Sequence, residues 1–387
     1  MNILLQILLI LLLAKAFGEF FERVGFPSVL GEISAGLLLV SVLLISPEDE
    51  ILKFLAGLGA IFFLFTAGYK ETNLSELRAT FKQSILPTTF EVSVPFIFGF
   101  LLGYMFNFSL LESLFIGVAL TPTSIGMTVR TLIDLDYLSN KVGSIRLNTS
   151  VLDDILCLFL LAVVMQIALY HELLVGQLLI MGGKLAAFML IMAILGLRIL
   201  PKLFQYIQKM HVEEAIFTGV IAVALFSAFL AEKLGLNAVI GAFIGGTIVS
   251  TIPIAKIKDV QDKVSGLSYG IFVPIFFAFI GLSIDPSAIS TAGLFAALLI
   301  ILALAGKVIG GFIGLKLVGF DSYDSLIYGV GGMPRVGVEL VVISIAQSMG
   351  IIGSEVFSAM VLMVVVSVLV TPIALKYAVG LKKRSVL

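Results

Sequence analysis

The sequence predicts an all-α polytopic membrane protein of about 13 transmembrane helices, built as two inverted six-helix repeats with two crossed broken helices. Of 387 residues, 60% are hydrophobic and 13% are charged, whereas about a quarter of the residues in a soluble domain are charged. Apolar runs of about 20 residues recur along the chain, and each is long enough to cross roughly 30 Å of hydrocarbon as a helix. Motifs also repeat between the two halves. Segments of about 10 residues with alternating polarity, which would predict a β-barrel, do not occur.

The apolar runs and the basic loops predict the spans and their orientation. The first run is expected to stay in the membrane rather than to be cleaved as a signal peptide, because no basic residue precedes it. Lysine and arginine gather in alternate loops and in the tail at 382–384. This asymmetry predicts an inner or plasma membrane protein with its N-terminus outside and its C-terminus in the cytoplasm. The expected spans are roughly 2–21, 27–45, 51–69, 84–106, 110–133, 144–170, 174–198, 212–233, 237–252, 266–284, 289–315, 324–348 and 353–379.

Three motifs recur at nearly one offset, which indicates an internal repeat. The offsets are 212, 210 and 214 residues, so spans 1–6 and 8–13 correspond and span 7 lies between them. Six crossings return the chain to its starting side, so the single extra helix inverts the second half. Inverted repeats of this kind are common in secondary transporters. The matches pair Ser113–Pro122 with Ser325–Pro334, Gly25–Gly36 with Gly235–Gly246, and Phe62–Phe65 with Phe276–Phe279.

The best of these matches falls on two prolines in the middle of spans. Thr121, Pro122, Thr123 and Ser124 interrupt span 5, and the run from Gly331 through Met333 to Pro334 interrupts span 12. Proline removes a helical hydrogen bond, and the freed backbone groups need partners inside the membrane. Paired interrupted helices point to a midplane substrate site, although two simple proline kinks would give the same pattern.

Asp153 and Asp154 lie side by side within the long apolar run 146–167. An ionisable residue at membrane depth costs roughly 2.5–3.5 kcal/mol and usually faces a water-filled cavity or a partner. Neighbouring residues on a helix point about 100° apart, so the two carboxylates can take different partners and roles. The alternative is a carboxylate pair at a water-exposed helix end. We expect both aspartates to bind the transported ion.

Lys307 is a further charge well inside a span, and we expect it to pair with one of the aspartates. Arg335 and Glu339 are spaced i,i+4, so they share a helix face and could pair with each other, with Glu71 or with Glu91. Structural ion pairing is the favoured interpretation for these residues.

Several uncharged side chains could add oxygen ligands for a hard monovalent cation. Any one of them is more often a hydroxyl or amide that packs helices together. The side-chain candidates are Thr121, Thr123, Ser124, Asn148 and Thr149, and the backbone at Met333 and Pro334 is a further candidate at the second break.

One cysteine, Cys157, and two histidines, His171 and His211, exclude a disulfide framework and make a cysteine or histidine metal cluster improbable. We therefore expect no cofactor, no catalytic residues and no nucleic-acid partner. The expected partners are H⁺, a monovalent cation and membrane lipid.

The motifs resemble those of the monovalent cation/proton antiporters, specifically the bacterial and archaeal sodium/proton exchangers with paired aspartates. The resemblance covers the whole chain. The position after Arg335 departs from it, because relatives commonly have Gly-Glu there. The motifs are Gly-Glu-Ile-Ser-Ala-Gly at 31–36, Thr-Pro-Thr-Ser at 121–124, Asn-Thr-Ser-Val-Leu-Asp-Asp at 148–154, Gly-Lys at 306–307 and Met-Pro-Arg-Val-Gly-Val-Glu at 333–339.

The resemblance implies a homodimer with the sodium/proton antiporter fold, in which a mobile core moves against a dimerisation scaffold. Asp154 would exchange Na⁺ and H⁺, and Asp153 would form a salt bridge to Lys307. Members with Asp-Asp generally move two protons per sodium and are electrogenic. The implied parts are 1–106 (scaffold spans 1–3 and core span 4), 107–170 (core), 171–211 (linker helix), 212–285 (scaffold) and 286–387 (core).

The resulting hypothesis is a secondary active Na⁺(Li⁺)/H⁺ antiporter for pH homeostasis, with elevator-type alternating access and competition at Asp154. A K⁺/H⁺ antiporter remains open, because the selection between Na⁺ and K⁺ depends on fine site geometry. A cation channel and an intramembrane aspartyl protease are weaker alternatives. The protease would need two aspartates on facing helices.

Overall fold

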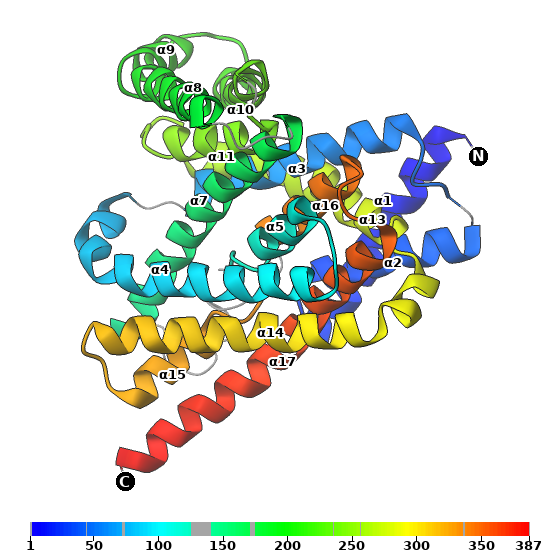
Figure 1. The fold of residues 1–387 in the computed structure, drawn as a ribbon. Coiled ribbons are helices and arrows are strands. Elements are labelled where there is room, and N and C mark those ends of the chain that lie inside the picture. The colour runs from blue at the N-terminus through cyan, green and yellow to red at the C-terminus, as the bar shows by residue number, and fades with distance from the viewer. Residues whose placement is uncertain are drawn as a thin grey trace. The chain divides into compact units, whose positions relative to one another are not determined.

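The protein is all-α in the computed structural model, which describes residues 2–43, 45–71, 74–124, 141–170, 175–234, 236–255, 257–335 and 337–386. The regular elements in these ranges are helices (Figure 1). Three predicted features lie outside the described residues. They are the side chain of Glu71, the whole of His171, and residues 125–133 of the predicted span 110–133. The helices are α1 (Ile3–Arg23), α2 (Ser28–Leu43), α3 (Glu50–Glu71), α4 (Leu74–Met105), α5 (Leu110–Ala119), α7 (Lys141–Tyr170), α8 (Val175–Ile194), η1 (Leu195–Ile199), α9 (Leu200–Ile207), α10 (Ala215–Lys233), α11 (Ala238–Val249), α12 (Lys258–Leu267), η2 (Ser268–Phe272), α13 (Val273–Leu282), α14 (Pro286–Leu317), α15 (Ser322–Gly331), α16 (Val338–Ser348) and α17 (Ser354–Val386).

Within the described residues, nine helices are long and apolar enough to cross a membrane. This finding confirms the predicted all-α polytopic class. Four shorter apolar helices lie inside other predicted spans, namely Ser28–Val42, Leu110–Ala119, Ala238–Val249 and Val338–Ser348.

Several helices extend further than the apolar runs predicted, for example at α12 and α17. The elements α12, η2 and α13 follow one another from Lys258 to Leu282, whereas the predicted span begins at 266. Helix α17 continues to Val386, beyond the predicted end at 379. Polar residues form the additional turns, because helical hydrogen bonds join backbone groups and do not require apolar side chains. The length of an apolar run therefore marks the part of the helix suited to hydrocarbon rather than its ends.

The chain forms two compact units, each assembled from segments that are distant in the sequence. Unit 1 contains α1, most of α2, α3 and the helices from α8 to α13. Unit 2 contains α4, α5, α7 and the helices from α14 to α17. Unit 1 is Met1–Glu22, Gly31–Ser75 and Leu169–Leu282, and unit 2 is Arg23–Leu30, Glu76–Ala168 and Ser283–Leu387.

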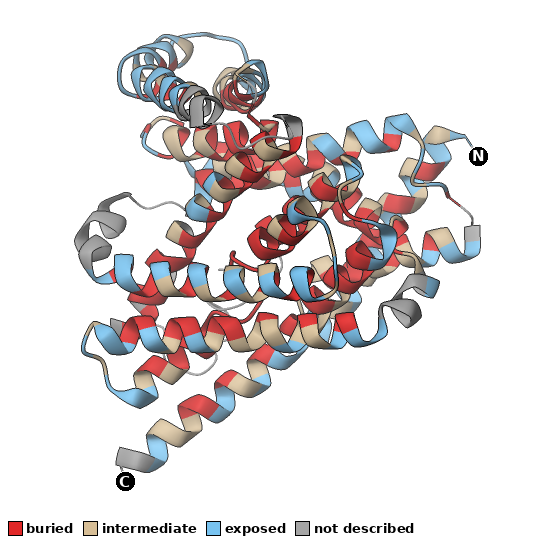
Figure 2. Ribbon diagram, viewed as in Figure 1, coloured by how far each residue is buried: buried red, intermediate tan, exposed pale blue. Residues whose placement is uncertain are grey.

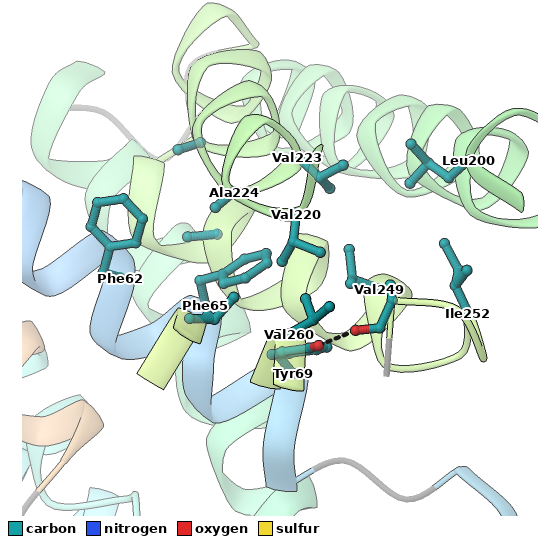
Figure 3. Close-up of a cluster of buried hydrophobic side chains, with 14 of the residues drawn as sticks. Phe62, Phe65, Tyr69, Leu200, Val220, Val223, Ala224, Val249, Ile252 and Val260 are labelled. Carbon is teal, nitrogen blue, oxygen red and sulfur yellow. Dashed lines mark hydrogen bonds between the residues drawn. The ribbon is translucent and has the colours of Figure 1, made fainter. Parts of the chain in front are cut away.

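In unit 1, close helix contacts depend on glycine. A Cβ at Gly246 on α11 would overlap the α3 backbone at Phe65, so only glycine allows this approach. A buried apolar cluster surrounds the contact, and Figure 3 shows side chains of α3 facing Val220 on α10. The Tyr69 hydroxyl donates a hydrogen bond to the Ala255 carbonyl, so the polar end of this buried ring has a partner.

In unit 2, a stripe of glycines lets α14 approach α4, and Figure 1 shows the two helices side by side. A Cβ at Gly306, Gly310 or Gly314 would meet backbone atoms of α4. Helices α15 and α17 also pack against α14. The three glycines are four residues apart, so they lie on one helix face and bring the face that carries them against α4.

The outward faces of the helices are apolar. On α14, Leu294 and Ile301 are exposed, while Leu299 and Ala303 are buried. Figure 2 shows this contrast as pale blue and red residues alternating around the helix. Soluble monomers rarely expose long apolar surfaces, whereas apolar side chains on a membrane helix are stable in contact with lipid. The surface of α14 therefore suits hydrocarbon.

Candidate functional site

The two predicted helix breaks meet in unit 2. Helix α5 ends at Ala119, and residues 120–124 are not α-helical; α15 ends at Gly331 and α16 begins at Val338. The Ser124 N–H donates a hydrogen bond to the Pro334 carbonyl, with an N–O distance of 2.8 Å. Each break thus supplies backbone partners to the other, as nonhelical backbone at membrane depth requires.

Asp153 lies on α7 beside these breaks and is fully buried. Its Oδ2 atom is 3.0 Å from the Lys307 ammonium on α14, 3.1 Å from the Thr123 hydroxyl and 3.4 Å from an Arg146 nitrogen. Asp154 is 6% exposed. The predicted aspartates, the lysine and one break residue therefore lie together in one unit.

Arg146 and Glu91 form an ion pair next to Asp153 that the sequence analysis did not predict. Both side chains are buried, and an Arg146 nitrogen contacts Glu91 Oε1. Glu91 Oε2 accepts a hydrogen bond from the Tyr328 hydroxyl at 2.8 Å, and its Oε1 is 3.8 Å from Lys307. Two cations thus lie between two carboxylates.

A signal for Arg146 was present in the sequence. It precedes Asp153 by seven residues, a separation of about 700°, which is only 20° short of two full turns. The two side chains therefore share one face of α7. An arginine at the start of an apolar run is also typical of a membrane boundary, so spacing alone does not separate the two interpretations.

Arg335 and Glu339, the i,i+4 pair, have other partners. The Arg335 guanidinium donates hydrogen bonds to the Pro122 carbonyl at 3.4 Å and to the Ala303 carbonyl at 3.1 Å. Glu339 Oε1 accepts a hydrogen bond from the Gly337 N–H at 2.8 Å, and its Oε2 has no hydrogen-bond partner among the residues that the structure describes. Arg335 thus bonds the first break to α14.

The remaining predicted ligands differ in where their hydroxyls point. The Thr121 hydroxyl donates to the Val118 carbonyl at 2.8 Å, and the Thr149 hydroxyl lies within 3.1 Å of carbonyls one turn earlier on α7. Such bonds within a helix are typical of hydroxyls in membrane spans. Thr123 instead reaches Asp153. Asn148, Met333 and Glu339 are buried and Ser124 is half-buried near these groups.

The buried charges around the breaks do not balance. Among the described residues of unit 2, the buried cations are Arg146, Lys307 and Arg335, and the buried carboxylates are Glu91, Asp153, Asp154 and Glu339. Three cations against four carboxylates leave one negative charge when all are ionised. Because an uncompensated charge at low dielectric is costly, this set favours the uptake of one monovalent cation or one proton.

Comparison with known proteins decides the family. The family model described as "Sodium/hydrogen exchanger, transmembrane" matches residues 8–379. The chain belongs to the sodium/hydrogen exchanger family. This exchanger is therefore a multi-pass transport protein of an antiporter family rather than an enzyme, and the aspartyl protease alternative falls away.

Relatives of this exchanger cover nearly its whole length. A Na⁺/H⁺ antiporter of Enterococcus hirae is 32% identical over 375 residues, which are 96% of this chain and 97% of the relative. The Na⁺/H⁺-K⁺ antiporter GerN of Bacillus cereus is 31% identical over 381 residues, 98% and 97% of the two chains. A solved structure of the sodium proton antiporter MjNhaP1 from Methanocaldococcus jannaschii matches with a TM-score of 0.75 at 16% identity and covers 97% of each chain. This last similarity shows a shared fold.

Proposed function

We propose that this exchanger is a secondary active antiporter that exchanges Na⁺, and also Li⁺, for protons at Asp154. The observation that carries the proposal is the buried cluster around the two breaks, where carboxylates outnumber cations by one among the described residues of unit 2. The Na⁺/H⁺ antiporters among the relatives support the choice of ions.

Competition for one carboxylate is sufficient to couple the two ions. Asp154 with bound Na⁺ and Asp154 with a bound proton are both close to neutral, so either form can cross the membrane barrier. The empty carboxylate carries a bare charge, and moving it through a low-dielectric barrier is costly. The protein therefore crosses only when it is loaded, which enforces exchange.

Lys307 would supply a second proton. It lies 3.0 Å from Asp153 Oδ2, and a buried lysine keeps its proton only while a carboxylate stabilises the charge. When Na⁺ engages the aspartates, Lys307 releases this proton, so two protons move for each Na⁺ and the Na⁺-loaded cluster carries one positive charge fewer than the proton-loaded cluster. Transport is then electrogenic and its rate depends on membrane voltage.

The larger architecture belongs to the same proposal. Unit 2 is the mobile core and unit 1 the dimerisation scaffold of a homodimer that works as an elevator. The division of the chain into two units, each with its own buried clusters, supports this assignment. Thirteen spans, the two inverted repeats and a cytoplasmic C-terminus complete it, supported by the repeated motifs and the positions of the basic loops.

A K⁺/H⁺ antiporter is the second candidate. The name of the Bacillus cereus relative includes K⁺, and that protein is 31% identical to this chain. Both cations fit the same coupling scheme. They differ in ionic size, so the number and spacing of oxygen ligands decide between them.

The test uses purified protein in liposomes that contain a pH dye, with Na⁺, Li⁺ or K⁺ added at clamped voltage. We expect Na⁺ and Li⁺ to change the internal pH, a rate that responds to voltage, and an apparent KM for Na⁺ that rises as the pH falls, because protons compete. Asp154→Asn should reduce exchange to the level of empty liposomes.

Each part of the proposal can fail separately. Exchange by Asp154→Asn at the wild-type rate contradicts the assignment of the site. Equal rates with K⁺ and Na⁺ overturn the choice of cation, and a voltage-independent rate overturns the two-proton stoichiometry. Movement of Na⁺ without protons would indicate a channel.

A further inference from the structure

Arg146 introduces a fixed positive charge beside the proposed ion site. We infer that Arg146 determines cation affinity. Its guanidinium pairs with the Asp153 carboxylate and thereby weakens binding of the transported cation enough for the cation to be released. This inference rests on the proposed function, because it concerns the cation that Asp153 and Asp154 would share. Arg146 acts through Asp153 and is a positioning residue.

The Arg146 side chain is held on several sides. One nitrogen contacts Glu91, and the other lies 3.1 Å from the Ser150 hydroxyl and 3.4 Å from Asp153 Oδ2. The guanidinium carbon lies 4.8 Å from the centre of the Tyr328 ring, a cation–π contact. The side chain is 1% exposed. With these partners, the charge stays beside Asp153.

The second break also packs against this ion pair. A Cβ at Gly332 would overlap Glu91 Oε1 and lie 3.0 Å from an Arg146 nitrogen. The Gly332 carbonyl is in turn 3.4 Å from the Thr123 hydroxyl. The ion pair between Arg146 and Glu91 therefore contacts the backbone of the second break at Gly332.

An arginine has a different effect here from a lysine. Guanidinium keeps its proton in proteins, whereas a buried lysine can lose its own. When Lys307 gives up its proton, Arg146 still carries a positive charge beside Asp153, so the incoming cation is attracted to Asp153 less strongly. Arg146 also repels the cation directly, because like charges a few ångströms apart interact strongly inside a protein.

Without Arg146 the cluster gains one negative charge. Glu91 and Asp153 then have only Lys307 between them in this cluster, and a bound cation replaces the missing charge. Binding should become tighter and release slower. A residue that merely held the helices together would give the opposite result on removal, namely weaker binding in a distorted site.

The experiment measures the apparent KM for Na⁺ and the maximal rate in liposomes at one alkaline pH, where protons compete least. Na⁺-dependent thermal stabilisation of the same proteins in detergent gives an independent affinity. Arg146→Met removes the charge, and Arg146→Lys replaces the guanidinium with an amine that can lose its proton. The double variant Glu91→Arg with Arg146→Glu keeps an ion pair but turns a carboxylate toward Asp153. The exposed Lys209, changed to Met, is the matched control.

We expect Arg146→Met to lower the KM for Na⁺ about tenfold and to lower the maximal rate. Arg146→Lys should lower the KM less, because a buried lysine can lose its proton, and Lys209→Met should stay near wild type. The exchanged pair should bind Na⁺ at least as tightly as Arg146→Met. If Arg146→Met does not fold, the neutral pair Glu91→Gln with Arg146→Gln still removes the guanidinium from Asp153. A smaller decrease in KM is then expected, because this pair also removes one negative charge.

Two results would overturn the inference. One is an unchanged or raised KM in folded Arg146→Met, or in the neutral pair where that is the variant that folds. The other is recovery of wild-type kinetics by the exchanged pair, which would mean that the ion pair acts only as a brace. Absence of Na⁺ exchange in the wild-type protein is a separate outcome, and it rejects the proposed function before any variant is compared.

Discussion

Two threonines of the first break differ in what their hydroxyls contact, although the sequence makes them equivalent. The Thr123 hydroxyl lies 3.1 Å from Asp153 Oδ2, whereas the Thr121 hydroxyl bonds to the Val118 carbonyl within its own turn. A hydroxyl that reaches a carboxylate can orient it and can also offer a lone pair to a cation. A hydroxyl bonded within its helix contributes to packing. We therefore expect Thr123 to act as an ion ligand and Thr121 as a packing group.

Replacing Thr123 with Val should weaken Na⁺ binding. The substitution preserves the side-chain shape and removes one hydrogen bond, worth about 1 kcal/mol, so the KM for Na⁺ should rise roughly fivefold. Thr123→Ser should retain the wild-type value. Liposome exchange assays over a range of Na⁺ concentrations measure the effect.

Thr121→Val is the control and should change the KM little. Equal increases for both valine variants would mean that the two hydroxyls act alike and that the observed contact with Asp153 is not the relevant difference.

At the residue level, sequence predicted which side chains carry charge at membrane depth but not how they combine. Asp153 and Lys307 were expected to interact through the resemblance, and they lie 3.0 Å apart. Arg335 had several predicted carboxylate partners, and it bonds backbone carbonyls instead. The choice between a carboxylate and a carbonyl depends on which helices face each other, and a single sequence does not fix that.

At the level of the elements, the glycine face of α14 controls how closely this helix approaches α4. Gly310 lies three residues after Lys307 on α14, and a Cβ there would meet the α4 backbone at Phe90 and Glu91. A separation of the two helices would therefore move Lys307 away from Glu91. The glycines four residues apart are visible in the sequence, but their partner helix is not.

Gly310→Ala should destabilise the protein by about 1–3 kcal/mol, because an inserted methyl in a close helix contact forces the backbones apart. Thermal unfolding in detergent measures the change. Gly380→Ala on α17 is the matched control, since a Cβ there meets nothing within 4 Å.

The control should be neutral or stabilising by up to about 1 kcal/mol, because alanine favours helix more than glycine does. A Gly310→Ala protein as stable as wild type would show that α14 and α4 are not held together at this glycine.

At the scale of the whole molecule, composition and apolar run length were enough to predict an all-α polytopic protein. Helix ends were predicted less well, as at α12 and α17. The thickness of the hydrocarbon layer sets the length of the apolar run but not the length of the helix that contains it. The grouping of spans into core and scaffold remains a prediction. The two compact units support it, and they join segments that are 94 residues apart in unit 1 (Ser75 to Leu169) and 115 residues apart in unit 2 (Ala168 to Ser283), a proximity that local patterns do not encode.

If the two units move as rigid bodies, a link inside either unit should leave exchange intact. In unit 1, Lys263 contacts Glu214 at 2.8 Å, and in unit 2, Lys382 contacts Asp324. Both pairs can be replaced by cysteines in a Cys157→Ser background and joined with a short, reducible thiol cross-linker. Exchange in liposomes is then measured before linking, after linking and after reduction.

We expect similar rates in all three conditions for both pairs, because elevator motion changes contacts between rigid units and not within them. The unlinked cysteine variants control for the substitutions themselves. A rate that falls on linking α15 to α17 and recovers on reduction would place the essential motion inside unit 2, at the half-helix that ends at Gly331. Alternating access would then depend on rearrangement of the broken helices, and the rigid-body form of the proposal would be wrong even if Asp154 remains the exchange site.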